Sequence, residues 1–234
     1  HYLQAKSDAE AARFLLQAQF SASEPEIAAV RSLGYLPWLE QQFSAPRTQT
    51  AWEWVESQPY NGTDVDATVW RQLMLSGDAV RKRMALALSE IFVVSANDIG
   101  SSWPTHMMAQ YWDTLGAGAT GKFRQLLEAV TLNPAMGFYL NTRGNQKENN
   151  RGRQPDENYA REVMQLMSIG LQQLEADGTP KTGPDGQPLD SYTQNDVTQL
   201  ARVFTGYDLD IKPAEGRTAF ARPAPATPSR PGTG

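Results

Sequence analysis

The sequence has no cysteine among its 234 residues and only two histidines, His1 and His106. The lack of cysteine excludes disulfide bonds, thiolate metal sites and cysteine nucleophiles. Any metal would therefore need oxygen ligands, apart from a formal copper site built from His1 and His106. We expect no dedicated metal centre and no required cofactor, while a hard cation on carboxylates stays open.

The sequence also lacks long apolar runs and an excess of positive charge. No stretch approaches the roughly 20 apolar residues that span a bilayer, and the most apolar segment, 84–94, contains Glu90. The formal net charge is −5, so the attraction that supplies most non-specific nucleic-acid affinity is missing. We therefore expect neither a transmembrane segment nor a nucleic-acid partner.

What the sequence does contain is helical periodicity, which predicts an all-α, irregular multi-helix domain over residues 1–211. Expected helices include 25–33, 78–94, 156–171 and one that Thr193 opens with Asp196 as a capping box. Residues 81–83, Arg-Lys-Arg, are interpreted as a solvated face. The turn signals at 177–178 and 184–186 predict one small β-hairpin, and the Pro/Ala-rich residues 212–234 predict an extended tail or linker.

The segment 141–155 stands out because it contains no large apolar residue. It carries Arg143, Lys147, Arg151 and Arg153 against a single acid, Glu148. Long polar loops inside folded domains are often functional. We expect this loop to be pinned against the helix that begins at residue 156.

Five segments in order resemble the bacterial family catalogued as domain of unknown function 1800. They are 156–166 (DENYAREVMQL) with Gly170, 12–20, 83–95, 133–141 and 192–206. Gln165 and Tyr207 depart from the family's usual acid and tryptophan. The resemblance implies an exported, periplasmic or extracellular bacterial protein, and a chain similar to the N-terminal portion of longer members. The sequence begins at His1 rather than Met, so either a signal peptide has been removed or the chain starts internally. It implies no established chemistry.

The expected helix 156–171 has an apolar arc, which includes Leu166, Met167 and Leu171, and a polar face. Facing the polar loop, that polar face would form a pocket in which Glu157 or Glu162 is the catalytic candidate. Arginines there would bind anionic groups. The candidate ligand-binding residues are Asn141, Arg143, Asn145, Arg151, Arg153, Asn158, Arg161, Glu162 and Gln165. A structural polar network and a plain solvated face remain open alternatives.

Two functions are consistent with these patterns. The first is an exported binding or assembly component of the cell envelope or of extracellular structures, with a protein partner or larger assembly. The alternative is a carboxylate-based, hydrolase-like enzyme on an anionic or glycan substrate. An enzyme needs a shielded carboxylate in a cleft, whereas a binding component needs exposed apolar surface.

Overall fold

The computed structural model describes residues 3–58, 65–75, 77–101, 103–210 and 224–228. These residues fall into two compact units, one spanning 1–96 and 101–130, the other 97–100 and 131–234. The predicted all-α architecture is confirmed, since the described residues form eleven α-helices and only two short strands. No helix in these ranges is long and apolar enough to cross a membrane.

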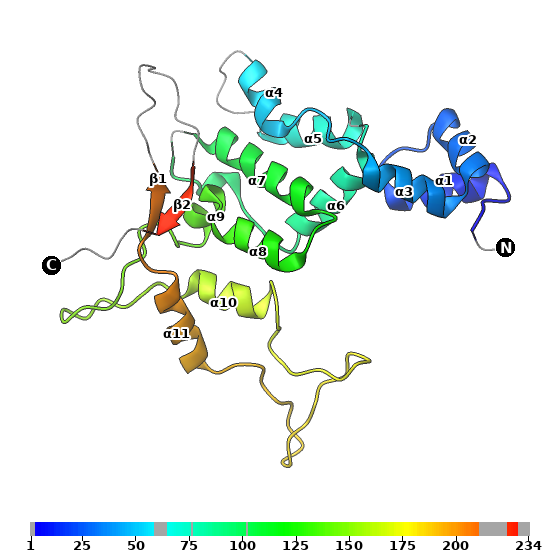
Figure 1. Cartoon of the computed structure of the whole chain (residues 1–234). Coiled ribbons are helices and arrows are strands. Elements are labelled where there is room, and N and C mark those ends of the chain that lie inside the picture. The colour runs from blue at the N-terminus through cyan, green and yellow to red at the C-terminus, as the bar shows by residue number, and fades with distance from the viewer. Residues whose placement is uncertain (1–2, 59–64, 76, 102, 211–223, 229–234) are drawn as a thin grey trace. The chain divides into compact units, whose positions relative to one another are not determined.

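The first unit begins with three short helices, α1 (Asp8–Ala18), α2 (Glu24–Leu33) and α3 (Tyr35–Ser44), drawn in blue in Figure 1. The Ser7 side chain caps α1 by accepting the Glu10 amide. Gly34, at φ +86°, joins α2 to α3, and a Cβ there would lie 2.9 Å from the Leu3 carbonyl oxygen. Leu15, Val30 and Trp38 form the buried core of these helices.

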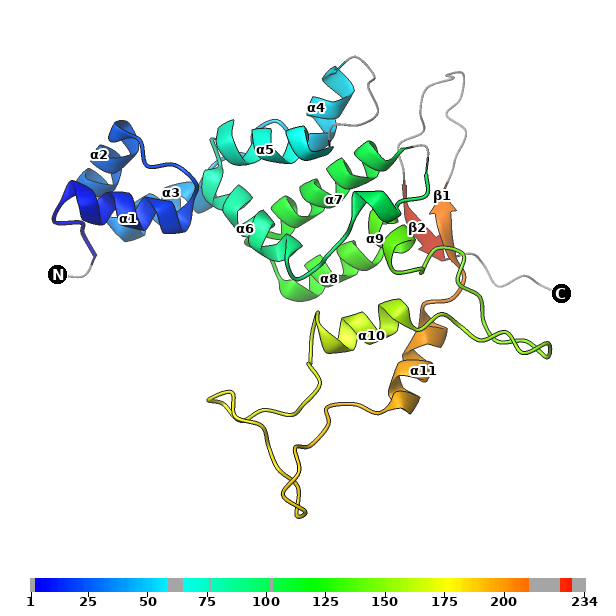
Figure 2. The same cartoon turned by 180° about the vertical axis from the view of Figure 1, so that it is seen from behind.

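The rest of this unit contains α4 (Ala51–Ser57), α5 (Val65–Leu75), α6 (Ala79–Ser89), α7 (Pro104–Gly118) and α8 (Phe123–Thr131). Helices α5, α6 and α7 pack against one another, as Figure 2 shows. Helix α6 ends at Ser89 rather than near 94. Residues 96–98 form a short 3-10 helix, η1.

Residues 81–83 are not a solvated face as predicted, because Lys82 is buried and Arg81 is ion-paired. The Arg81 Nε lies 3.2 Å from Oδ2 of the fully buried Asp78, and the Thr48 hydroxyl donates to Oδ1 of the same carboxylate at 2.7 Å. Burial lowers the pKa of Lys82, an effect that the Asp78 charge opposes. Asp78 lies three and four residues before Arg81 and Lys82, so the pairing itself is local. Spacing did not indicate that the cluster is buried, because burial depends on how α6 packs.

The second unit contains α9 (Pro134–Tyr139), α10 (Asn158–Gln165), α11 (Gln194–Val203), β1 (Tyr207–Asp210) and β2 (Ala224–Pro228). The two strands pair antiparallel. Helices α10 and α11 lie side by side (Figure 1) over a buried seam of Ala160, Met164, Val197 and Ala201. The ring of Tyr159 meets Phe204 edge-on at 4.8 Å between centroids.

Helix α10 ends at Gln165, six residues before the predicted end at residue 171. The amides of Leu166 and Met167 both donate to the Glu162 carbonyl, and the Gly170 amide donates to that of Met164. Gly170, four residues beyond the C-cap Leu166, has φ +74° and lets the chain turn away there. The chain therefore leaves the helix while its apolar periodicity continues.

Residues 166–190, which we name the arm, extend away from α10 and α11 (Figures 1 and 2). Its three segments bond in a closed ring: the Gln173 amide donates to Leu189, that of Leu189 to Lys181, and that of Lys181 to Gln173. Asp177 and Asp185 each accept the amide two residues on, from Thr179 and Gln187. The predicted hairpin turns thus form, as isolated bridges rather than full strands.

The periodicity that predicts one helical domain over 1–211 does not predict the division into two units. Each unit buries its own apolar cluster, and which stripes share a core is a non-local property. Of the predicted tail 212–234, residues 212–223 and 229–234 lie outside the described residues. Residues 224–228 form β2.

Candidate functional site

The polar loop 141–155 is pinned at its base by Asn145, a buried amide. The Asn145 side chain accepts the Asp156 amide at 2.9 Å and donates to the carbonyls of Asp156 and Phe204, at 3.2 and 3.3 Å. It therefore joins the loop to the chain before α10 and to the end of α11. The expected docking of the loop is confirmed at this base, where Asn145 satisfies buried backbone groups.

Two other candidate residues stabilise the same base. Asn141, at φ +60°, donates from its side chain to the Asp156 carboxylate at 3.2 Å. Arg143 pairs with Asp208 at 3.2 Å and lies over the Phe138 ring, 4.6 Å from its centroid. Both side chains are therefore engaged inside the unit.

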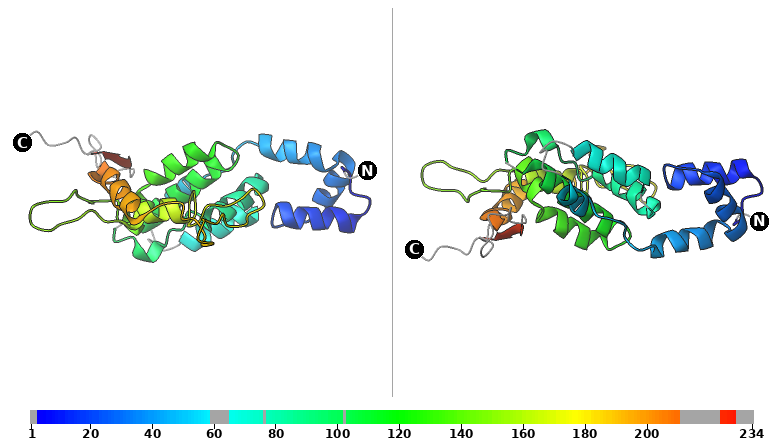
Figure 3. Two further views of the ribbon diagram at one scale, coloured as in Figure 1. Left: turned by 90° about the horizontal axis from the view of Figure 1, so that it is seen from below. Right: turned by 90° about the horizontal axis from the view of Figure 1, so that it is seen from above.

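Beyond the base, the loop projects as a long, narrow excursion of the chain, which Figure 3 shows. Its tip is closed locally, because the Asn149 carboxamide accepts the amides of Arg151 and Arg153. Glu148 pairs with Arg202 of α11 at 3.0 Å. Arg151 and Arg153 are exposed, and in the described part of the chain no hydrogen bond or ion pair joins them to Glu162.

A polar network, which we name the Glu157 cluster, connects α10 to α11. Glu157 accepts the Thr198 hydroxyl at 2.8 Å, the Gln194 amide at 2.9 Å and an Arg161 guanidinium N–H at 3.0 Å. Arg161 also donates to the Gln194 carboxamide oxygen at 3.1 Å. The hydrogen bonds from Thr198 and Gln194, followed by the Arg161 charge, hold the pKa of Glu157 below its usual range. Both carboxylate oxygens of Glu157 are thus occupied.

The remaining polar candidates on α10 are Asn158, Glu162 and Gln165. Asn158 is exposed and donates through its backbone amide to the Asp156 carboxylate at 2.9 Å. Glu162 and Gln165 are half-buried. Among the described residues, no hydrogen bond or ion pair reaches either side chain. The candidates therefore fall into two groups. Those around Asn145 and Glu157 form hydrogen bonds within the unit, whereas the side chains of Glu162 and Gln165 on α10 form none with the described residues.

Gln194 and Thr198 were missed by sequence reasoning, although they complete the Glu157 cluster. Their spacing of four places them on one face of α11, and this was the available signal. Pairing that face with α10 required the packing of two helices separated by the whole arm. Asp156, which anchors the loop base, was likewise read only as a helix start.

The described residues hold no group of three or more histidine or acidic side chains that could bind a metal ion. His1 lies outside the described residues, so the copper arrangement with His106 is not observed. His106 packs against the rings of Trp52 and Trp103, and burial lowers its pKa. An apolar aromatic setting of this kind favours the neutral imidazole.

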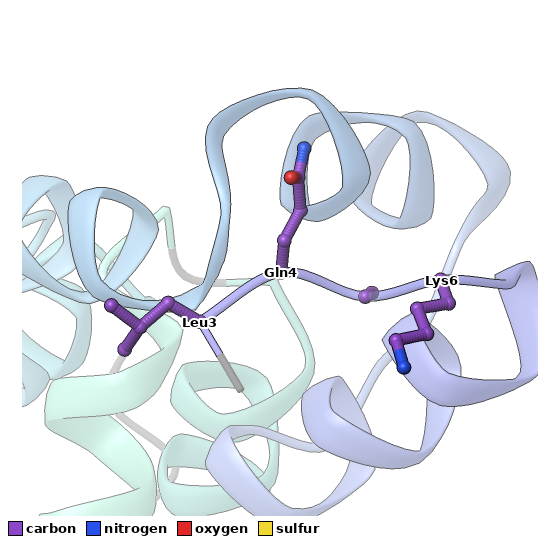
Figure 4. Close-up of a pocket in the computed structure, with 4 residues that line it drawn as sticks. Leu3, Gln4 and Lys6 are labelled. Carbon is purple, nitrogen blue, oxygen red and sulfur yellow. The ribbon is translucent and has the colours of Figure 1, made fainter. Parts of the chain in front are cut away.

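A pocket in the first unit lies along the N-terminal segment, lined by Leu3, Gln4, Ala5 and Lys6 (Figure 4). A larger hollow beside it, about 670 Å³, is bounded by Asp8 and Arg31, which pair with each other at 2.6 Å. Their charges are therefore mutually satisfied. Neither hollow brings catalytic side chains together in the way that an enzyme site requires.

Comparison with known protein families shows which family the chain belongs to. The model of the family described as protein of unknown function (DUF1800) matches residues 13–230. The chain belongs to the DUF1800 family. The resemblance of the five sequence segments is thereby confirmed. No curated protein and no solved structure matches the chain.

Proposed function

We propose that this DUF1800 protein is a binding or assembly component of the bacterial cell envelope or of extracellular structures, and that the arm is its docking element. The supporting observation is the exposure of large apolar side chains along the arm. Leu166, Ile169, Leu171 and Leu174 are 53–60% exposed. Exposed apolar surface of this density is typical of a protein interaction site.

The arm combines this apolar surface with a defined backbone. Its closed ring of hydrogen bonds and its two Asx turns fix residues 173–189, none of which is buried. A pre-ordered loop loses less conformational entropy when a partner binds. The arm thus has the properties of a docking element rather than of a linker.

The polar candidates favour the same function over the carboxylate enzyme. Glu157, one of the two catalytic candidates, is held by three donors within its own unit. A lowered pKa makes a carboxylate a weaker general base, whereas catalytic bases are usually tuned toward neutral pH. The cluster is therefore better explained as the connection that holds α10 and α11 behind the arm.

The proposal is tested by photo-crosslinking in intact bacterial cells that produce the full chain. A photoreactive residue at Ala176, which is exposed on the arm, is expected to give a discrete adduct of higher mass. The same residue at Asn150, on the exposed loop tip, serves as the control and is expected to give none. Cell fractionation of the adduct tests the envelope or extracellular location separately.

A matched pair of variants assigns the adduct to the apolar surface. Serine at Leu171, Leu174 and Leu189 should abolish it, whereas serine at the exposed Leu16, Leu36 and Leu75 of the first unit should leave it intact. Equal adduct yields from both variants, or no adduct at Ala176, would contradict a docking role for the arm.

A further inference from the structure

The first unit contains a second surface feature, a groove of about 380 Å³ between α5, α6 and α7. The views of Figures 1 and 2 agree that these helices lie together. Trp70 and Leu73 line it from α5, Val93 from the chain after α6, and Tyr111 and Trp112 from α7. The volume falls in the range of ligand-binding sites.

The walls of the groove differ in exposure in a way that suits an interface. Leu73, Tyr111 and Trp112 are 3–6% exposed and form its fixed floor. Trp70 is 60% exposed and Val93 44% exposed, so the rim presents apolar surface to an occupant. Tryptophan and tyrosine are among the residue types that contribute most to binding when an occupant covers them.

Two acidic side chains, Asp66 and Glu90, line the groove and are exposed. No lysine or arginine is among its lining residues, and the nearby Arg83 guanidinium lies over the ring of Phe20, which also lines the groove. The described residues show no ion pair to either carboxylate. Burial and the nearby Glu90 carboxylate raise the pKa of Tyr111, whose hydroxyl donates to the Phe92 carbonyl. The charge of this surface thus calls for a cationic group above an apolar floor.

The face of α5 that lines the groove sets the length of segment it can hold. Asp66, Trp70 and Leu73 follow helical spacing along one face of α5, over about 10 Å at 1.5 Å per residue. This length accommodates a few residues of peptide.

We propose that the groove binds a short peptide segment in which apolar side chains are combined with a lysine or arginine. The apolar side chains pack on Leu73 and Trp112, the cation lies near Asp66 and Glu90, and Trp70 covers the segment. This site is distinct from the arm, which belongs to the other compact unit. The groove and the arm are therefore tested independently.

The test uses the full chain and a displayed library of random 12-residue peptides. Enrichment of peptides that carry both apolar and basic residues is expected. The affinity of an enriched peptide should fall at least about tenfold in Trp70→Ala and in the double variant Asp66→Asn/Glu90→Gln, each equivalent to about 1.4 kcal/mol. Because these side chains are exposed, we expect unchanged thermal melts.

The double variant Glu40→Gln/Glu128→Gln is the charge-matched control, since both acids are exposed and lie outside the groove. It should change the affinity less than about twofold. An equal loss in this control would overturn the proposal by showing a non-specific charge effect, as would enrichment of peptides without basic residues or no enrichment. Binding of phosphatidylglycerol vesicles that is lost in Trp70→Ala, without peptide enrichment, would reassign the groove to lipid. The serine variants of the arm should leave peptide affinity unchanged.

Discussion

The α10–α11 pair and the arm are adjacent in the chain and both contain large apolar side chains, yet they use these side chains in opposite ways. In the helix pair, Met164 and Val197 are buried and the polar side chains bond to one another. In the arm, Leu171 and Leu174 are exposed, and the backbone bonds between 173 and 189 join segments of the arm to one another. Apolar periodicity therefore indicates a buried surface only where a second element is present to cover it.

The largest contrast should appear between two apolar truncations on either side of the end of α10. Met164→Ala removes a side chain that is 9% exposed and should lower the free energy of unfolding by about 2 to 4 kcal/mol. Leu171→Ala, at 56% exposure, should change it by less than about 0.5 kcal/mol. Urea denaturation of both variants measures this difference, and equal losses would show that the arm is packed in solution.

A smaller but still large effect is expected at the loop base. Asn145→Ala leaves the Asp156 amide and two carbonyls without their side-chain partner, and should lower the free energy of unfolding by about 2 kcal/mol. Asn150→Ala, at the exposed tip, is the control and should have no measurable effect. Denaturant melts of the two variants decide whether the loop is held at its base or only at its tip.

Glu157→Gln should lower the free energy of unfolding by about 1 kcal/mol at neutral pH. The charged acceptor of three hydrogen bonds becomes neutral, and the new side-chain NH2 group meets one of the donors that the carboxylate accepted. The folded pKa of Glu157 is lowered, so its contribution is present above the unfolded pKa of about 4 and is lost as the pH falls through the folded value. Melts at pH 7 and pH 3 should therefore show the variant and wild type converging at low pH. A difference in stability that is the same at pH 7 and pH 3 would show that the effect does not depend on the charge of Glu157.

The smallest effect is expected for Glu162→Gln, since no described residue forms a hydrogen bond or ion pair with this side chain. The free energy of unfolding should change by less than about 0.5 kcal/mol. Thermal melts measure this, with Glu157→Gln as the reference. A drop of 1 kcal/mol or more would reveal a structural network around Glu162 and would remove it as a candidate base.

Several elements could be predicted from local sequence because their signals are local. Ser7 and Thr193 cap helices with bonds to amides three residues away, and the Asp-Gly pairs at 177 and 185 form their turns in place. The end of α10 could not be predicted from Leu166, Met167 and Leu171, because these residues continue the helical pattern beyond Gln165. Gly170 indicated that the helix ends before residue 171. The apolar periodicity, which continues to Leu171, predicted the longer helix.

The candidate site was predicted less well, for a different physical reason. Composition identified the polar residues of the loop and of α10, but not their partners. Asn145 is used to satisfy backbone groups from two distant segments, and Glu157 is used by residues about forty positions away. A polar side chain has the same appearance in sequence whether it binds a ligand or a buried carbonyl.

The sequence by itself determined the absence of thiol chemistry, the helical class, the helix caps, the Asp-Gly turns and the family, because each depends on residue type or on short-range spacing. Only the tertiary structure decided that Glu157 joins two helices, that Lys82 is buried beside Asp78, and that the leucines of the arm remain uncovered. These outcomes depend on which surfaces meet. Burial and hydrogen-bond satisfaction are properties of the packed chain, and no local pattern encodes them.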